Sequence, residues 1–154
     1  MITISKFLTL IACFIFVCDL YGQETGKYIE QYEGTIGART FTVKVLRIGE
    51  KENEEVLIQI IGVDDPLDGQ IYKYKKEWQS SEKRNNRYIY VTKQIPGKER
   101  FAALHSDNNY GRQVFKVFLM DTPMEAIYIY PKAYQENLDP NFMYSQYLQQ
   151  QEKR

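Results

Sequence analysis

The chain has 154 residues, and its 20 basic and 20 acidic side chains leave no net charge at neutral pH. A nucleic-acid-binding surface generally needs a clear basic excess, so this balance argues against a nucleic-acid partner. About 130 residues follow the apolar N-terminus, which is the size of one ordinary domain with its own core.

The N-terminus has the pattern of a secretory signal peptide. Lys6 supplies a positive charge, and an almost uninterrupted apolar run extends from Phe7 to Cys18. A bilayer-spanning helix needs about 20 residues, whereas the apolar part of a signal peptide needs about 7–15. Gly22 is a small residue in front of the expected cut. We therefore expect residues 1–22 to be removed, and the mature chain from Gln23 to be secreted or periplasmic, without a transmembrane segment.

A lipid anchor at Cys13 is the less favoured alternative. The stretch "LIAC" at 10–13 fits a lipoprotein pattern, but it would leave a short apolar region before the cut and an apolar start to the mature chain. Cys13 and Cys18 are the two cysteines of the chain, so the expected mature domain, residues 23–154, cannot form a disulfide or a thiolate metal site. Zinc motifs and phosphate-binding glycine loops are also missing, and we expect no metal and no cofactor.

The rest of the chain is divided by turn residues at short, regular intervals. Runs rich in Val, Ile, Tyr, Phe and Thr lie between these turns, a pattern typical of a sandwich or a barrel. Pro96 and Gly97, for example, occupy the positions that a type II turn requires. We predict eight strands near residues 28–33, 39–48, 55–63, 70–77, 87–95, 100–105, 112–120 and 125–130.

Two features qualify this pattern. In the second strand Leu46 and Ile48 fall on the otherwise polar face, which we interpret as a bulge or a bend. At the C-terminus Asp139 can cap a helix over residues 140–151, with Pro140 at the favoured first position. The apolar stripe of this helix should be buried against the sheet, and it contains Met143, Tyr144, Tyr147 and Leu148.

Eight strands followed by a helix resemble, in outline, a lipocalin-like up-and-down barrel. The first strand has "YEGTIG" at 32–37 where that family has Gly-x-Trp, and the single tryptophan is Trp78. We therefore carry no site residue over from that family. The predicted fold class is all-β, with about eight antiparallel strands as a lipocalin-like barrel or a two-sheet sandwich and one C-terminal α-helix.

Three strands contain alternating tyrosines, in "IYKY" at 71–74, "YIYV" at 88–91 and "IYIY" at 127–130. Because successive side chains of a strand point to opposite faces, each stretch places two tyrosines on one face. The simplest interpretation puts the isoleucines in the core and the tyrosines on a half-exposed face. A sharper one gathers tyrosines into a site for a small apolar or sugar ligand, which in the barrel alternative would lie along the lumen. The candidate ligand-binding residues are Tyr72, Tyr74, Tyr88, Tyr90, Tyr128 and Tyr130.

Consecutive strands usually pair, so the first four of these tyrosines should share one face, whereas the position of Tyr128 and Tyr130 depends on the strand order. The loop at 75–87 is a second candidate surface, for a protein partner. Tryptophan and arginine dominate interface hot spots, and this loop contains Trp78, Arg84 and Arg87.

Evidence for catalysis is weak. His105, Ser106 and Asp107 have the residue types of a hydrolytic triad, but consecutive side chains cannot converge. The stretch "DDPLDG" at 64–69 fails the EF-hand pattern and is better explained as a turn whose carboxylates cap local amides. The sequence thus predicts a non-enzymatic binding protein for a small ligand, a glycan or an envelope protein. The alternative is a carboxylate-dependent hydrolase, for which Glu30, Glu33 and Asp121 are candidates.

Overall fold

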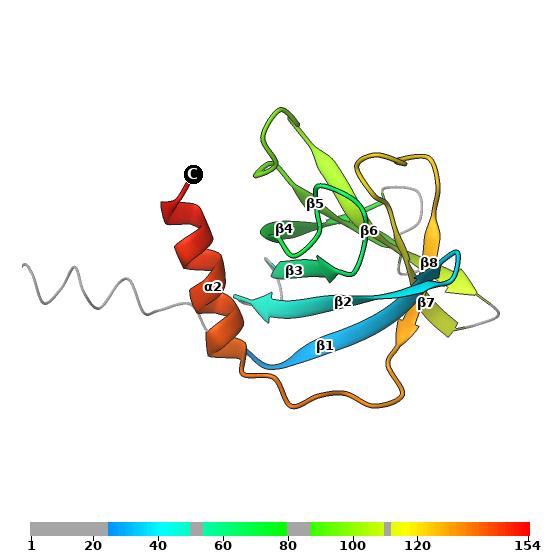
Figure 1. The fold of residues 1–154 in the computed structure, drawn as a ribbon, viewed down its shortest axis with the longest axis horizontal. Coiled ribbons are helices and arrows are strands. Elements are labelled where there is room, and N and C mark those ends of the chain that lie inside the picture. Colours follow the sequence, from blue (N-terminus) through cyan, green and yellow to red (C-terminus); the bar gives the residue numbers. More distant parts are fainter. Residues whose placement is uncertain (1–24, 50–53, 80–86, 110–111) are drawn as a thin grey trace, which may run out of the picture.

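The computed structural model describes residues 25–49, 54–79, 87–109 and 112–154. In these residues the chain forms a closed antiparallel barrel of eight strands with one helix beside it (Figure 1). Each strand pairs with its neighbours in sequence, and β1 pairs with β8 to close the barrel. The elements are β1 (Thr25–Ile36), β2 (Arg39–Ile48), β3 (Glu55–Ile61), β4 (Ile71–Trp78), β5 (Tyr88–Thr92), β6 (Phe101–Asn109), β7 (Arg112–Val117), β8 (Ile127–Pro131) and α2 (Pro140–Glu152).

All eight predicted strands and the C-terminal helix are therefore confirmed, and the barrel is correct rather than the sandwich. The signal-peptide segment lies outside the described residues. The turn at 95–98 has the expected form, because Lys98 N–H donates to the Ile95 carbonyl at 3.1 Å and Gly97 has a φ of 75°.

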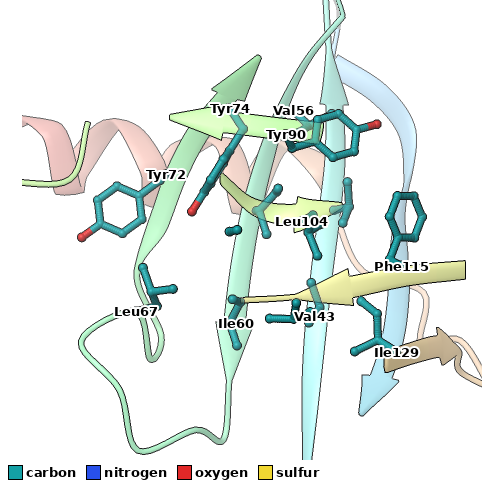
Figure 2. Close-up of a cluster of buried hydrophobic side chains, with 14 of the residues drawn as sticks. Val43, Val56, Ile60, Leu67, Tyr72, Tyr74, Tyr90, Leu104, Phe115 and Ile129 are labelled. Atoms are coloured by element: carbon teal, nitrogen blue, oxygen red, sulfur yellow. The ribbon is translucent and has the colours of Figure 1, made fainter. Parts of the chain in front are cut away.

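The interior of the barrel is filled by side chains of its own strands. Phe41, Val43 and Val45 alternate into it from β2, and Val56, Ile58 and Ile60 do so from β3. Phe115 and Ile129 come from the other side of the barrel, so the opposing walls meet in one apolar cluster (Figure 2). Apolar side chains thus fill the interior of the barrel from wall to wall.

The predicted bulge in β2 is wrong. The register between β2 and β3 is unbroken from Thr42↔Ile61 to Ile48↔Glu55, and the extra residues lie in β1, between Thr25 and Ile29. Leu46 and Ile48 are apolar because they face α2 on the outside of the barrel. They form a second apolar cluster there with Ile29, Leu57, Ile71, Met143 and Tyr147.

Helix α2 begins as predicted. Asp139 caps it by accepting a hydrogen bond from Asn141 N–H at 2.9 Å, and Pro140 occupies the first turn. Met143 and Tyr147 are buried against the barrel, but the expectation of a buried Leu148 is wrong, because this side chain is 41% exposed. Leu148 follows Tyr147 by one position, so it is rotated about 100° from the contact line.

Candidate functional site

Four of the six candidate tyrosines lie inside the barrel. Tyr72, Tyr74, Tyr88 and Tyr90 are all buried and belong to the interior cluster. The prediction that they share one face is confirmed. The simplest interpretation, with the isoleucines in the core, is wrong for β4 and β5: for example, Ile71 lies outside, under α2.

These interior rings pack on one another and on the opposite wall. The rings of Tyr88 and Tyr90 meet edge to face with centroids 5.5 Å apart, and Tyr88 also contacts Phe115 at 6.2 Å. Figure 2 shows Tyr72 and Tyr74 on one side of the cluster and the Tyr90 hydroxyl directed to the other side. Burial raises the pKa of Tyr74 and of Tyr90. As packed, these four side chains build the core.

A network of charged side chains closes one end of this core, where β2 ends and β3 begins. Arg47 pairs with Glu30, with Nε and Oε1 2.8 Å apart, and also with Glu54. Lys76 Nζ lies 3.1 Å from the second Glu54 oxygen, and the Tyr90 hydroxyl donates to Glu54 at 3.1 Å. Two cations meet two carboxylates, so this cluster, which we call the charged end, neutralises itself. Glu30 is therefore occupied by Arg47 and is a poor candidate for catalysis.

Trp78 and Arg87, two of the three predicted partner residues, lie at the same end. Trp78 is 43% exposed, and its ring meets Tyr88 edge to face at 5.5 Å. Lys76 Nζ lies 4.8 Å from the Trp78 ring centroid, and burial together with Arg47 lowers the pKa of Lys76. Arg87 pairs with Asp107 at 3.5 Å. Arg84 lies outside the described residues.

A groove of about 680 Å³ lies at the other end of the barrel, where β1 and β8 separate. Their pairing covers only three positions and ends at Gly34↔Ile129, although both strands continue beyond this pair. We call this feature the seam groove. It is lined by residues 33–37, Asp64, Leu119, Thr122, residues 125–128, Tyr130 and Pro131.

Gly34 allows the barrel to close tightly beside the seam groove. A Cβ atom at this position would lie 2.5 Å from Cζ of Phe41 and 2.7 Å from Cγ2 of Ile129. Only glycine leaves room for both side chains, so the two walls meet there and the groove begins beyond them. The groove therefore sits on the packed core, not above an open lumen.

Tyr128 and Tyr130, whose position depended on the strand order, line the seam groove. They are 39% and 50% exposed, while Ile129 between them points into the core, as expected for this strand. Tyr130 is the direct cross-strand neighbour of Glu33. The Tyr128 hydroxyl donates to Asp107 at 3.3 Å, and Lys116 Nζ lies 5.2 Å from the Tyr128 ring centroid. Tyr128 is thus held in place, and Tyr130 is the freer ring.

Three carboxylates complete the lining, namely Glu33, Asp64 and Glu125. Within the described part of the chain none of the three has an ion-pair partner. Among the residues that the structure describes, no lysine, arginine or histidine lines the groove. The lining of the groove consequently combines acidic residues, the apolar residues Leu119, Ala126 and Ile127, and two tyrosines.

The loop that carries Asp64 is fixed by its other aspartates, as the turn interpretation predicts. Asp68 accepts hydrogen bonds from Gly62 N–H at 2.7 Å and Val63 N–H at 3.1 Å, and Asp65 accepts from Leu67 N–H at 3.0 Å. Asp65 also accepts from Asp121 N–H at 3.0 Å, which joins this loop to the β7–β8 loop. The two loops that border the groove therefore hold each other in place.

Other catalytic or metal arrangements find no support. Ser106 points inward and accepts a hydrogen bond from Tyr88 N–H at 2.7 Å, whereas Asp107, one position on, pairs on the outer face with Lys116. The three consecutive residues thus form no triad, as expected. Among the described residues no group of three or more acidic, histidine or cysteine side chains could hold a metal ion.

Sequence reasoning placed Tyr128 and Tyr130 among the candidate ligand-binding residues and Glu33 among the possible carboxylates, but it did not bring them together. It missed Asp64 and Glu125 as parts of a site. Glu125 stands two residues before the "IYIY" stretch, and that closeness was the available signal. The residues that lie near Glu125 depend on how β1 pairs with β8 to close the barrel. This pairing joins distant parts of the chain and cannot be read from a local sequence pattern.

No protein family, curated protein or solved structure matches this chain significantly. No helix within the described residues is long and apolar enough to cross a membrane.

Proposed function

We propose that this chain is an exported, non-enzymatic binding protein and that its ligand occupies the seam groove. One observation carries the proposal: a groove of about 680 Å³ is lined by two partly exposed tyrosines and by three acidic residues that have no ion-pair partner in the described part of the chain. Small-molecule sites typically have about 300–1,000 Å³ and combine an apolar lining with a few polar groups. The interior tyrosines are a weaker candidate, because they pack against one another and against Phe115.

Export is proposed from the N-terminal sequence, and the fold is compatible with it. The first strand begins at Thr25, three residues after the expected cut behind Gly22. Removal of residues 1–22 would thus leave every strand and the helix intact. Intact-mass analysis of the native protein tests this part of the proposal. A mass that retains residues 1–22, or a diacyl group on Cys13, would refute it.

The location of the site can be tested before the ligand is known. A library of small fragments, including monosaccharides and flat aromatic compounds, is screened against isotope-labelled protein by two-dimensional NMR. We expect the hits to shift the backbone signals of Ala126, Ile127 and Tyr130. In Tyr130→Ser the same hits should bind more weakly, because aromatic contacts are lost, while the fold should persist because this side chain is half exposed.

Tyr134→Ser serves as the matched control, because this tyrosine is 80% exposed and does not line the groove. Hits that shift only Tyr72 and Tyr74 would move the site to the barrel interior and refute the seam groove. Hits that cluster around Trp78 would instead favour the charged end and a protein partner.

A hydrolase is the second candidate, because Glu33, Asp64 and Glu125 line the same groove. Glycoside hydrolases use two carboxyl groups about 5–9 Å apart, one as acid and one as base or nucleophile. Turnover of chromogenic glycosides that disappears in Glu33→Gln or Glu125→Gln would establish the enzyme. Binding of a glycoside without turnover would support the non-enzymatic proposal.

A further inference from the structure

We infer that the seam groove selects a small organic cation, an ammonium or guanidinium group on a short apolar stem. This inference rests on the proposed function and names the class of ligand for the same groove. It follows from how charge, apolar surface and aromatic rings are distributed among the lining residues.

Among the described residues, the three carboxylates of the groove have no ion-pair partner and no cation lines the groove. Glu33, Asp64 and Glu125 come from β1, the β3–β4 loop and the β7–β8 loop, so three separate segments each contribute an exposed acidic residue to the lining. Lys116, whose Nζ lies 5.2 Å from the Tyr128 ring centroid, is paired with Asp107. Arg39 pairs with Ile36 in register and Lys132 follows Pro131 in sequence, but neither is among the described residues that line the groove. A ligand cation would be attracted by this excess of negative charge, and an anion would be repelled.

The carboxylates of the charged end behave differently. Glu30 and Glu54 are paired with Arg47 and Lys76, so two positive charges neutralise their two negative charges. Within the described residues, Glu30 and Glu54 are thus neutralised at one end of the barrel, whereas the three acidic residues of the seam groove have no ion-pair partner. This contrast singles out the seam groove as the place for a positive ligand.

The remaining lining suits the apolar part of such a ligand. Leu119, Ala126 and Ile127 contribute apolar surface to the lining that an alkyl stem can cover. Tyr130 stands directly across from Glu33, so a cation near that carboxylate would lie beside an aromatic ring. A cation near the face of a tyrosine is attracted by the ring, and the attraction grows when water is excluded. The volume fits a small molecule, and we therefore assign one in preference to a protein partner.

The test uses probes of equal length and different charge. The protein from Gln23 to Arg154 is titrated with n-butylammonium, n-butylguanidinium, n-butanol and butyrate, and binding is followed by the NMR signals of Ala126 and Tyr130. We expect the two cations to bind about tenfold or more tightly than butanol, with butyrate weakest, and the cation affinity to fall as salt is added.

Variants test whether the acidic residues of the groove cause the preference for cations. In the triple variant Glu33→Gln, Asp64→Asn, Glu125→Gln the cations should bind no better than butanol. Glu152→Gln on α2 removes one carboxylate that does not line the groove, and it should leave the preference unchanged. The four-probe series on the unmodified protein decides the question even if the triple variant fails to fold.

The outcomes separate this inference from the proposed function. Equal binding of butanol and the cations in the groove would overturn the cation assignment and leave the groove as a ligand site. Absence of any probe or fragment from the groove would overturn both. Tighter binding of the tripeptide Ac-Gly-Arg-Gly-NH₂ than of n-butylguanidinium would overturn the small-molecule assignment and indicate an arginine of a protein partner.

Discussion

The side chain of Gln150 forms two hydrogen bonds with the main chain of Ile71, as a neighbouring strand would. Its Oε1 accepts from the Ile71 N–H and its Nε2 donates to the Ile71 carbonyl, both at 2.9 Å. Strand β5 pairs with β4 only from Lys75 onward, so the first half of β4 has no strand on that side. Helix α2 thus completes the barrel wall between β4 and β5 with an amide side chain.

Gln150→Ala should therefore destabilise the protein. Both Ile71 groups would lose their partner beneath α2, and each hydrogen bond contributes about 0.5–1.5 kcal/mol. We expect a loss of about 1–3 kcal/mol in the free energy of unfolding, measured by urea denaturation, and faster hydrogen exchange at Ile71. Gln149→Ala is the matched control at the next, exposed position and should change stability by less than about 0.5 kcal/mol. Equal effects of the two variants would show that the amide pairing is unimportant.

The anchoring of α2 can be tested with two apolar side chains of similar size. Met143 is buried against the barrel, and Met143→Ala should cost about 2–4 kcal/mol because it removes buried surface and leaves a cavity. Leu148 is 41% exposed, so Leu148→Ala should cost less than about 1 kcal/mol. Chemical denaturation of both variants measures the difference. A larger loss for Leu148→Ala would mean that the helix packs through another face.

The strands and the helix could be predicted because their signals are local. Alternation, turn residues and the Asp139–Pro140 cap act within a few residues of the chain. The meaning of Leu46 and Ile48 could not be predicted in this way. Whether an apolar outer face is covered by a helix depends on α2, which follows about a hundred residues later, and the sequence suggested a bulge instead.

For the candidate site, too, local signals predicted some features, while others depend on distant parts of the chain. Alternation established that the tyrosines of each strand share a face, but not whether that face is inside or outside the barrel. Tyr72 points inward and Tyr130 outward although their local patterns are alike. Isoleucine and tyrosine are both acceptable in a core, so the residue types of these strands do not decide which face points inward. Phe41 and Ile129 already fill the space beside Gly34, where no larger residue fits.

Gly34→Ala should destabilise the protein, because the core beside Gly34 has no room for a larger side chain. The added methyl group would lie 2.5 Å from Cζ of Phe41, and overpacking of a core costs about 1–3 kcal/mol. Phe41→Leu removes the obstructing ring atoms and is destabilising by itself. If the clash is the cause, the double variant should lose clearly less stability than the sum of the single variants, as measured in a double-mutant cycle. Additive losses would place the cost of Gly34→Ala in the backbone instead.

The interior tyrosines predict how the protein responds to alkaline pH. Burial raises the pKa of Tyr74 above its ordinary value of 10.0, because an ionised hydroxyl would lose its hydration inside the barrel. Below pH 10 the folded and unfolded states both keep this proton. Above pH 10 the unfolded state releases it and the folded state does not, so the free energy of unfolding falls by about 1.4 kcal/mol per pH unit for each such group.

Tyr74→Phe removes one of these protons, and its stability should decline less steeply than that of the unmodified protein between pH 10 and pH 12. Urea denaturation at a series of pH values measures the two slopes. Tyr90→Phe should also reduce the slope, because burial raises the pKa of Tyr90 as well. This second variant should in addition lose stability at neutral pH, since the Tyr90 hydroxyl donates to Glu54 at 3.1 Å in the charged end. If Tyr74→Phe and the unmodified protein declined in parallel above pH 10, Tyr74 would have to ionise within the folded barrel, and the tightly packed interior inferred above would be wrong.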